Sequence, residues 1–194
     1  MEKKKVFKII TFIIYFIYIV SMLYFIYINS IRKAIFILAC ILGNFILIRL
    51  NKKYSQLFPD SIVIILIIFI MFSILFGTCF NMYDRFIRYD DFLHLWSGII
   101  SCSIAYLVFV NLGKYEVDNN MRKIFFVIYM IMFAIGVSGI WELIEFSLDK
   151  FFCANCQAGG LVDTMVDMFD GLIGTILITP YYFCKLIKSN KMYK

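Results

Sequence analysis

Residues 161–175 read LVDTMVDMFDGLIGT and carry three aspartates in an otherwise apolar stretch: Asp163, Asp167 and Asp170. These residues are spaced i, i+4 and i+7, so a helix of 3.6 residues per turn places all three carboxylates on one narrow stripe. A charged side chain near the centre of a bilayer costs roughly 2.5 to 3.5 kcal/mol on insertion scales. In a membrane this stripe therefore faces protein, water or a cation, and it predicts a polar site.

The composition of the chain is that of an integral membrane protein. Of the 194 residues, 63% are hydrophobic and 19% aromatic, and the mean hydropathy is +0.89. Soluble domains are roughly 45 to 50% apolar, and a spanning helix needs about 20 apolar residues. We predict an all-α fold, a polytopic membrane helical bundle formed as one domain over residues 1–194. The sequence indicates about six transmembrane helices: 6–28, 34–50, 61–80, 92–110, 124–147 and 161–183.

The basic residues predict the orientation of this bundle. Six spans place both termini on one side, and loops rich in Lys and Arg stay in the cytoplasm. With a cytoplasmic N-terminus the inner segments hold fourteen of the nineteen basic residues, and the outer segments hold five: Arg32, Lys33, Arg85, Arg88 and Lys150. We therefore expect cytoplasmic termini. The net charge of +6 follows from this topology, and because the basic residues form no patch, no nucleic-acid partner is expected.

The acidic residues gather toward the opposite face. Seven of the thirteen lie at helix ends near the outer side: Asp90, Asp91, Glu142, Glu145, Asp163, Asp167 and Asp170. At a rise of about 1.5 Å per residue, Asp170 lies roughly 13 Å and Glu142 roughly 8 Å below the outer boundary. Three helices therefore bring carboxylates to similar depth, and we expect these side chains to converge.

The helix at 92–110 adds an imidazole to the acids. His94, the single histidine of the chain, follows Asp90 at i+4 and Asp91 at i+3, so all three residues can share a face. A metal ligand, a proton carrier and a structural role remain open for this histidine. The next helix carries Glu142 and Glu145 one turn apart. Two such glutamates need a shared cation, a shared proton or hydrogen-bond donors, unless they lie shallow enough to stay hydrated.

Two outer loops contain further candidate site residues. Arg85 and Arg88 can hold an anionic head group, although pairing with neighbouring aspartates or with lipid phosphate is the favoured interpretation. Cys153 and Cys156 form the motif CANC, which fits a redox pair, a disulfide or half of a zinc site. Because a second CxxC is absent from the sequence, a disulfide that holds the loop over the site is preferred.

Most of the polar intramembrane residues between positions 84 and 178 belong to one pattern: Asp90, Asp91, His94, Gly98, Trp141, Glu142, Glu145, Asp163, Asp167, Met168, Asp170 and Gly174. This pattern resembles the YjdF-like family of small bacterial multispanning membrane proteins. The acidic helix followed by glycine is also similar to the VanZ-like proteins linked to glycopeptide resistance, but the arginine expected shortly before that helix is absent. The resemblance implies a protein of the bacterial plasma membrane and implies no reaction.

Three functions are compatible with these residues. The first is a divalent-metal site with hydrolytic or transfer chemistry on a lipid-linked or envelope substrate, since carboxylates suit Mg²⁺, Mn²⁺ or Ca²⁺ and an imidazole adds Zn²⁺. Its candidate ligands are Asp163, Asp167, Glu142, Glu145, His94, Asp90 and Asp91. Asp170 and His94 are the candidate catalytic groups, and Arg85 or Arg88 would orient an anionic substrate. The second function is a cation- or proton-coupled transporter, and the third is a structural or partner-binding membrane protein.

Overall fold

The computed structural model describes residues 2–112, 119–152, 156–157 and 159–191, and these ranges are helical apart from short turns. This confirms the predicted all-α class. The chain divides into two compact units, Met1–Tyr89 and Asp90–Lys194. The prediction of one domain over residues 1–194 stays a prediction.

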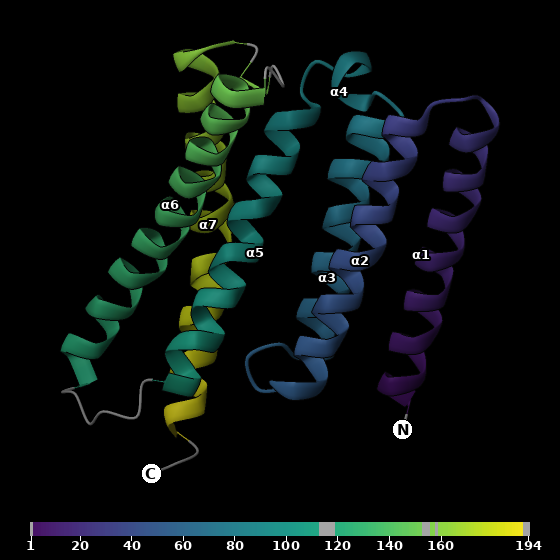
Figure 1. Cartoon of the computed structure of the whole chain (residues 1–194). Coiled ribbons are helices and arrows are strands. Elements are labelled where there is room, and N and C mark those ends of the chain that lie inside the picture. The colour runs from purple at the N-terminus through teal and green to yellow at the C-terminus, as the bar shows by residue number, and fades with distance from the viewer. Residues whose placement is uncertain (1, 113–118, 153–155, 158, 192–194) are drawn as a thin grey trace. The chain divides into compact units, whose positions relative to one another are not determined.

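The first unit consists of helices that follow one another along the chain and are joined by short turns. They are α1 (Glu2–Tyr27), α2 (Ile31–Lys53), α3 (Asp60–Ile70), the π-helix η1 (Met71–Cys79) that continues α3, and the short α4 (Met82–Arg85). Figure 1 shows α1, α2 and α3 side by side. The chain leaves α1 and η1 through Asn29 and Asn81, whose φ angles are 56° and 57°. Asparagine tolerates this left-handed conformation because its short polar side chain bonds locally.

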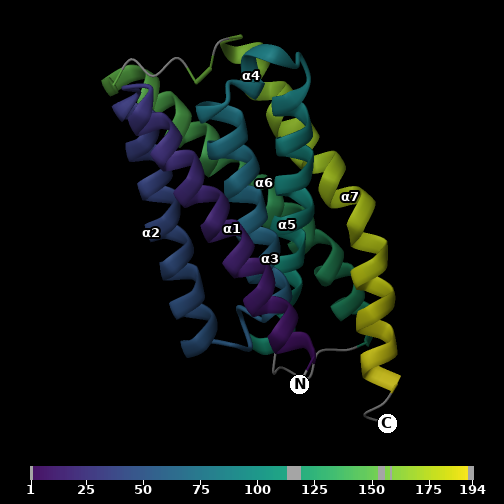
Figure 2. The ribbon, with the colours of Figure 1, turned by 90° about the vertical axis from the view of Figure 1, so that its right-hand side faces the viewer.

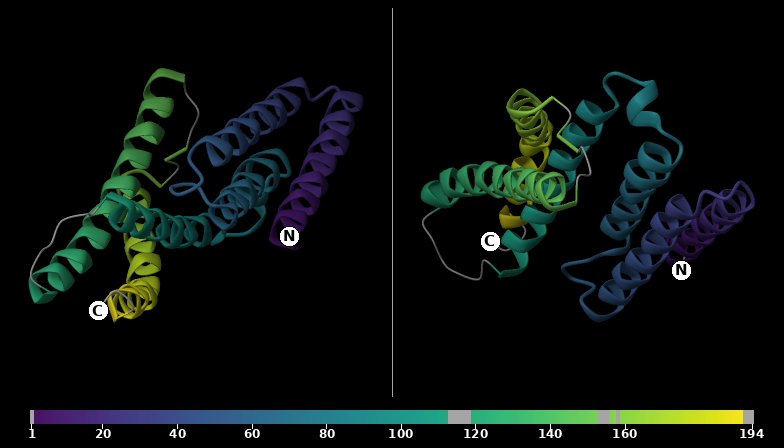
Figure 3. Two further views of the ribbon diagram at one scale, coloured as in Figure 1. Left: turned by 90° about the horizontal axis from the view of Figure 1, so that it is seen from below. Right: turned by 45° about the horizontal axis from the view of Figure 1, so that its top comes forward.

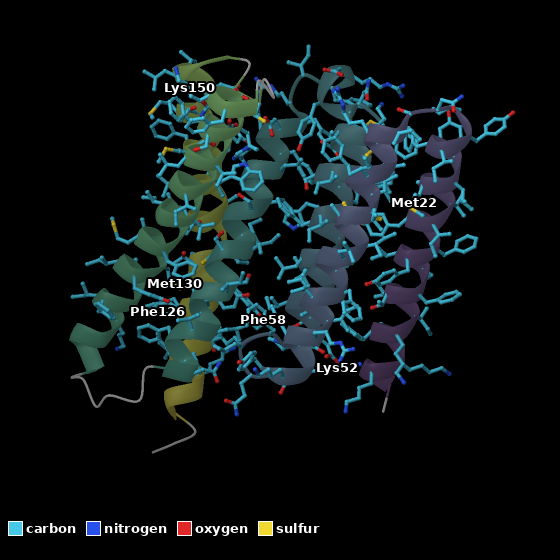
Figure 4. The ribbon with its side chains drawn as sticks, in the orientation of Figure 1. Met22, Lys52, Phe58, Phe126, Met130 and Lys150 are labelled. Carbon is cyan, nitrogen blue, oxygen red and sulfur yellow. The ribbon has the colours of Figure 1, made fainter. Side chains whose placement is uncertain are left out.

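The core of the first unit is apolar and lies between α1, α2, α3 and η1. Its most buried side chains include Tyr18, Ile37, Ile67 and Leu75. The turn between α2 and α3 carries Phe58, which packs against this core at the end where α2 carries Lys52 (Figure 4). Many Ile, Leu and Phe side chains on the outer faces of α1 and α2 are exposed, as expected for helices that contact lipid.

The second unit contains three long helices, α5 (Tyr89–Leu112), α6 (Asn119–Phe152) and α7 (Leu161–Lys191). Figures 2 and 3 show that α6 and α7 cross at an angle. Phe126 and Met130 of α6, labelled in Figure 4, are fully buried and pack with Cys102 of α5 and Leu186 of α7. This apolar cluster therefore holds all three helices together toward the C-terminal half of α7.

Glycines allow α5 and α7 to approach closely beside the acidic stretch. A Cβ added at Gly98 would overlap the carbonyl of Gly171, and one added at Gly174 would overlap the carbonyl of Leu95. Thr175 is fully buried next to this contact and donates to the carbonyl oxygens of Gly171 and Gly98, at 2.9 and 3.2 Å. Small residues of this kind bring backbones together in membrane helix pairs.

The predicted helices agree with the observed ones within a few residues at most ends, and α6 and α7 are longer than expected. In the part of the chain that the structure describes, five helical segments are long and apolar enough to span a membrane: Lys4–Tyr27, Ile31–Lys53, Asp60–Cys79, Tyr89–Asn111 and Lys123–Phe151. Helix α7 is not among them, although its 31 residues exceed the length that a bilayer requires. The aspartates of α7 lower its mean hydropathy, so α7 stays a predicted sixth span. Because the side on which the termini lie depends on the number of spans, their cytoplasmic position also stays a prediction.

Candidate metal centre

Asp167 lies at the centre of a group of titratable side chains in the second unit. It comes from the second turn of α7 and is 2% exposed. His94 of α5 is also buried, and its Nε2 lies 3.8 Å from Asp167 Oδ1 and 3.5 Å from Asp90 Oδ1. The predicted spacing of Asp90 and His94 along one helix face therefore brings both side chains to the aspartate stripe of α7.

Helix α6 supplies two further carboxylates to the same place. Glu142 is 5% exposed, and the Oε1 atom of Glu145 accepts a 2.7 Å hydrogen bond from the indole of Trp141. Glu142, Glu145 and Asp167 each offer an oxygen within 4.8 Å of the other two. The expected convergence of α5, α6 and α7 is thus present in the geometry.

Asp167 belongs to three overlapping groups whose potential ligand atoms lie within 4.8 Å of one another. The groups are Asp90 with His94 and Asp167, Asp91 with Asp167 and Asp170, and Glu142 with Glu145 and Asp167. The first group mixes an imidazole with carboxylates, and the other two consist of oxygen ligands alone. A shared carboxylate with two oxygens is able to bridge neighbouring cations, as in two-metal sites.

Two buried carboxylate oxygens of this cluster accept no hydrogen bond from the described residues. On the two residues of the cluster that are most buried, Asp167 and Glu142, these oxygens are Asp167 Oδ2 and Glu142 Oε1. Buried carboxylates ordinarily have hydrogen-bond or charge partners, because removing a charged oxygen from water without one is costly. The two oxygens therefore point to an additional partner at this site.

A loop residue that the sequence did not single out closes one side of the cluster. Gln157 Nε2 donates to Glu142 Oε2 at 3.3 Å and to Thr164 Oγ1 at 2.8 Å. Asp149 at the end of α6 positions this loop, since its carboxylate accepts the backbone N–H groups of Cys156 and Gln157 at 2.6 and 2.8 Å. The hydrogen bonds of Gln157 and Asp149 involve a loop, so no helical spacing in the sequence predicts them.

The other predicted site residues have different positions. Asp163 belongs to none of the three groups, and its side chain lies against Gly159, where a Cβ would be 2.8 Å from Asp163 Cβ. Asp170, expected to lie outside the ligand set, is in a group with Asp91 and Asp167. Arg85 and Arg88 are exposed residues of the first unit, and their role toward an anionic substrate stays a prediction.

The predicted cysteine pair is described only in part. Cys153 lies outside the described residues, so the disulfide or redox pair stays a prediction. Cys156 is half-buried and forms no disulfide with a described residue. Burial and the nearby Asp149 carboxylate raise the pKa of this thiol to about 11. The Cys156 thiol is therefore protonated at neutral pH, which makes it a poor nucleophile.

Fold and site together define a polytopic helical membrane protein with a buried acidic cluster. A family model described as predicted membrane protein (DUF2238) matches residues 10–186, and the chain belongs to this family. An uncharacterized protein of Thermotoga maritima is 25% identical over 154 residues, which cover 77% of this chain and 73% of that protein. No solved structure matches the chain. The family assignment agrees with the resemblance to the YjdF-like proteins.

Proposed function

We propose that this protein binds divalent cations in the cluster around Asp167 and uses them on an anionic, lipid-linked substrate of the cell envelope. The observation that carries the proposal is the buried Asp167 Oδ2 atom, which accepts no hydrogen bond from the described residues in a cluster of convergent ligand atoms. Carboxylates are the ligands that Mg²⁺, Mn²⁺ and Ca²⁺ prefer. The imidazole of His94 extends the range to Zn²⁺.

The three groups suggest distinct roles for their members. Asp90 and His94 would hold one cation, Glu142 and Glu145 would hold a second, and Asp167 would contribute to both groups. Bound divalent cations would supply Lewis-acid stabilisation of the charge that develops in a displacement at phosphorus. Asp170 offers a carboxylate oxygen near that of Asp167 and would serve as a proton acceptor.

Metal analysis of the purified protein tests this proposal. We expect a stoichiometric divalent metal in the wild type by elemental analysis, and its loss in Asp167→Asn and in Glu142→Gln. Asp84→Asn is the matched control, because Asp84 is an exposed carboxylate of α4. Wild-type protein that stays free of metal after dialysis against Mg²⁺, Mn²⁺ and Zn²⁺ would contradict the proposal. Retention of the metal by folded Asp167→Asn would contradict it equally.

One observation favours a second candidate, proton-coupled transport. His94 Nε2 lies within 4 Å of carboxylate oxygens on both Asp90 and Asp167, an arrangement in which an imidazole is able to pass a proton between two carboxylates. The test is proton flux into liposomes that contain the protein. Flux that disappears in His94→Asn, in a preparation without bound metal, would replace the metal proposal with this one.

A further inference from the structure

A groove of about 690 Å³ runs between α6 and α7 next to the acidic cluster. Apolar side chains line much of it, including Leu143 and Phe146 of α6 and Met168 of α7. Glu142 belongs both to this groove and to the acidic cluster. The groove therefore connects an apolar surface of the helix pair directly with the proposed metal ligands.

The end of this groove near the loop is polar and carries one charge of each sign, Lys150 and Asp149, and the Asp149 carboxylate accepts hydrogen bonds from the backbone N–H groups of Cys156 and Gln157. Lys150 and Gln157 line it, and Figure 4 shows Lys150 at the end of α6 next to the start of α7. Lys150 is exposed and forms no ion pair with the described part of the chain. Lysines at the ends of membrane helices attract lipid phosphate, because the ammonium group lies near the head groups.

We propose that this groove binds a phosphate-bearing lipid, with an acyl chain against Leu143, Phe146 and Met168 and the phosphate between Lys150 and Glu142. The inference rests on the proposed function and names its substrate class. Glu142 and Lys150 are eight residues apart, or roughly 12 Å along the helix axis. Both residues line the same groove, so a head group that lies along it can contact both.

Three features of the groove match the acyl chain and the phosphate of such a lipid. The apolar walls take the chain, Lys150 takes a negative charge, and a cation held by Glu142 would contact a phosphate oxygen. A volume of about 690 Å³ lies within the range of ligand pockets, roughly 300–1,000 Å³. Free phosphate would contact only the charged end of the groove. A comparison of its affinity with that of a phosphate-bearing lipid therefore distinguishes the two ligands.

Calorimetric titration of the full chain in detergent tests the inference with three probes. They are dioctanoyl phosphatidate, dioctanoyl glycerol and inorganic phosphate, each with excess Mg²⁺ and again with a chelator. With Mg²⁺ we expect phosphatidate to bind at least about tenfold more tightly than either of the other probes, since it alone uses both parts of the groove. Inorganic phosphate that binds as tightly as phosphatidate would overturn the inference in favour of a free-phosphate site.

Two pairs of variants locate the lipid. Leu143→Trp fills the groove and is expected to weaken both lipids by about tenfold. Ile144→Trp adds the same bulk to a neighbouring residue that does not line the groove, and is expected to leave binding unchanged. Lys150→Gln is expected to weaken phosphatidate by about three- to fivefold and to leave dioctanoyl glycerol unchanged, while Lys123→Gln at the other end of α6 has no effect on either lipid. If the two tryptophan variants, or the two glutamine variants, changed lipid affinity equally, the lipid would not lie in this groove.

Binding of dioctanoyl glycerol in the presence of the chelator tests the lipid inference separately from the metal proposal. Dioctanoyl glycerol reports on the acyl chain without any phosphate, so its loss of affinity in Leu143→Trp does not depend on a cation. If the metal analysis fails and this effect remains, the groove binds lipid without the proposed chemistry. If metal is present and the effect is absent, the metal site stands and the lipid inference is wrong.

Discussion

Replacing Gly174 with alanine tests how strongly the contact between α5 and α7 is constrained. The new methyl group would overlap the carbonyl oxygen of Leu95 and would lie 3.0 Å from its carbonyl carbon and 3.3 Å from the backbone nitrogen of Ile99. These neighbours are backbone atoms of a helix, which cannot turn away as a side chain can. The helices must therefore separate, by about 1.5 Å, before the contacts become ordinary van der Waals contacts.

The size of the effect follows from comparison with a second glycine. Gly136 of α6 has no atom within 4 Å of an added Cβ. Alanine is favoured over glycine in a helix by roughly 0.5–1 kcal/mol, and this gain is common to both substitutions. Overpacking costs about 1–3 kcal/mol. The free energy of unfolding of Gly174→Ala is thus expected to lie about 1–3 kcal/mol below that of Gly136→Ala.

The same displacement should reach the proposed metal site without changing a proposed ligand. Leu95 adjoins His94, whose Nε2 lies 3.8 Å from Asp167 Oδ1. Metal ligands must be placed within about 0.2 Å, so a shift of about 1.5 Å is expected to lower metal affinity by about 10- to 100-fold. Reversible unfolding in mixed micelles and metal titration measure the two effects. Equal stability and equal metal affinity of Gly174→Ala and Gly136→Ala would refute the close helix contact.

Two further predictions concern the first unit and the loop. Lys33 donates two 2.7 Å hydrogen bonds that hold the end of η1, so Lys33→Met is expected to lower the free energy of unfolding by about 1–3 kcal/mol, and Arg32→Met by under about 0.5 kcal/mol. Equal losses would contradict this role. Because the pKa of Cys156 is raised to about 11, its alkylation in reductant is expected to accelerate up to about pH 11 and to shift to lower pH in Asp149→Asn. Mass spectrometry of a variant that keeps Cys156 as its one cysteine measures this rate, and a profile unchanged by Asp149→Asn would exclude the effect of that carboxylate.

The helices and most of the acidic cluster were predictable because both depend on local periodicity. The i, i+4 spacing of Asp90 and His94 places both on one helix face, and the depths estimated for Glu142 and Asp170 indicated convergence. In a membrane protein, helix periodicity also predicts which face is buried, since a charged stripe has to face the protein interior. The sequence pattern therefore carried information about tertiary structure that a soluble helix would not have given.

The division of roles along the aspartate stripe was not predictable. Asp163 and Asp170 are seven residues apart, or roughly 10 Å along the axis, so one compact site cannot contain both equally. Which end joins the cluster depends on where α5 crosses α7, and that position is determined by Gly98, Gly171 and Gly174. Gln157 was missed for another reason, because a single loop residue has no periodic neighbours.

The balance of charge in the cluster argues for a bound cation more strongly than the count of ligands does. The three groups contain six carboxylates and one imidazole: Asp90, Asp91, Glu142, Glu145, Asp167, Asp170 and His94. Even a protonated His94 offsets only one negative charge, and the described ion pairs of these acids involve no lysine or arginine. The remaining charge has to be balanced by retained protons or by cations. Two divalent cations would neutralise most of the charge of the cluster, and they would also supply a partner for the buried oxygens of Asp167 and Glu142.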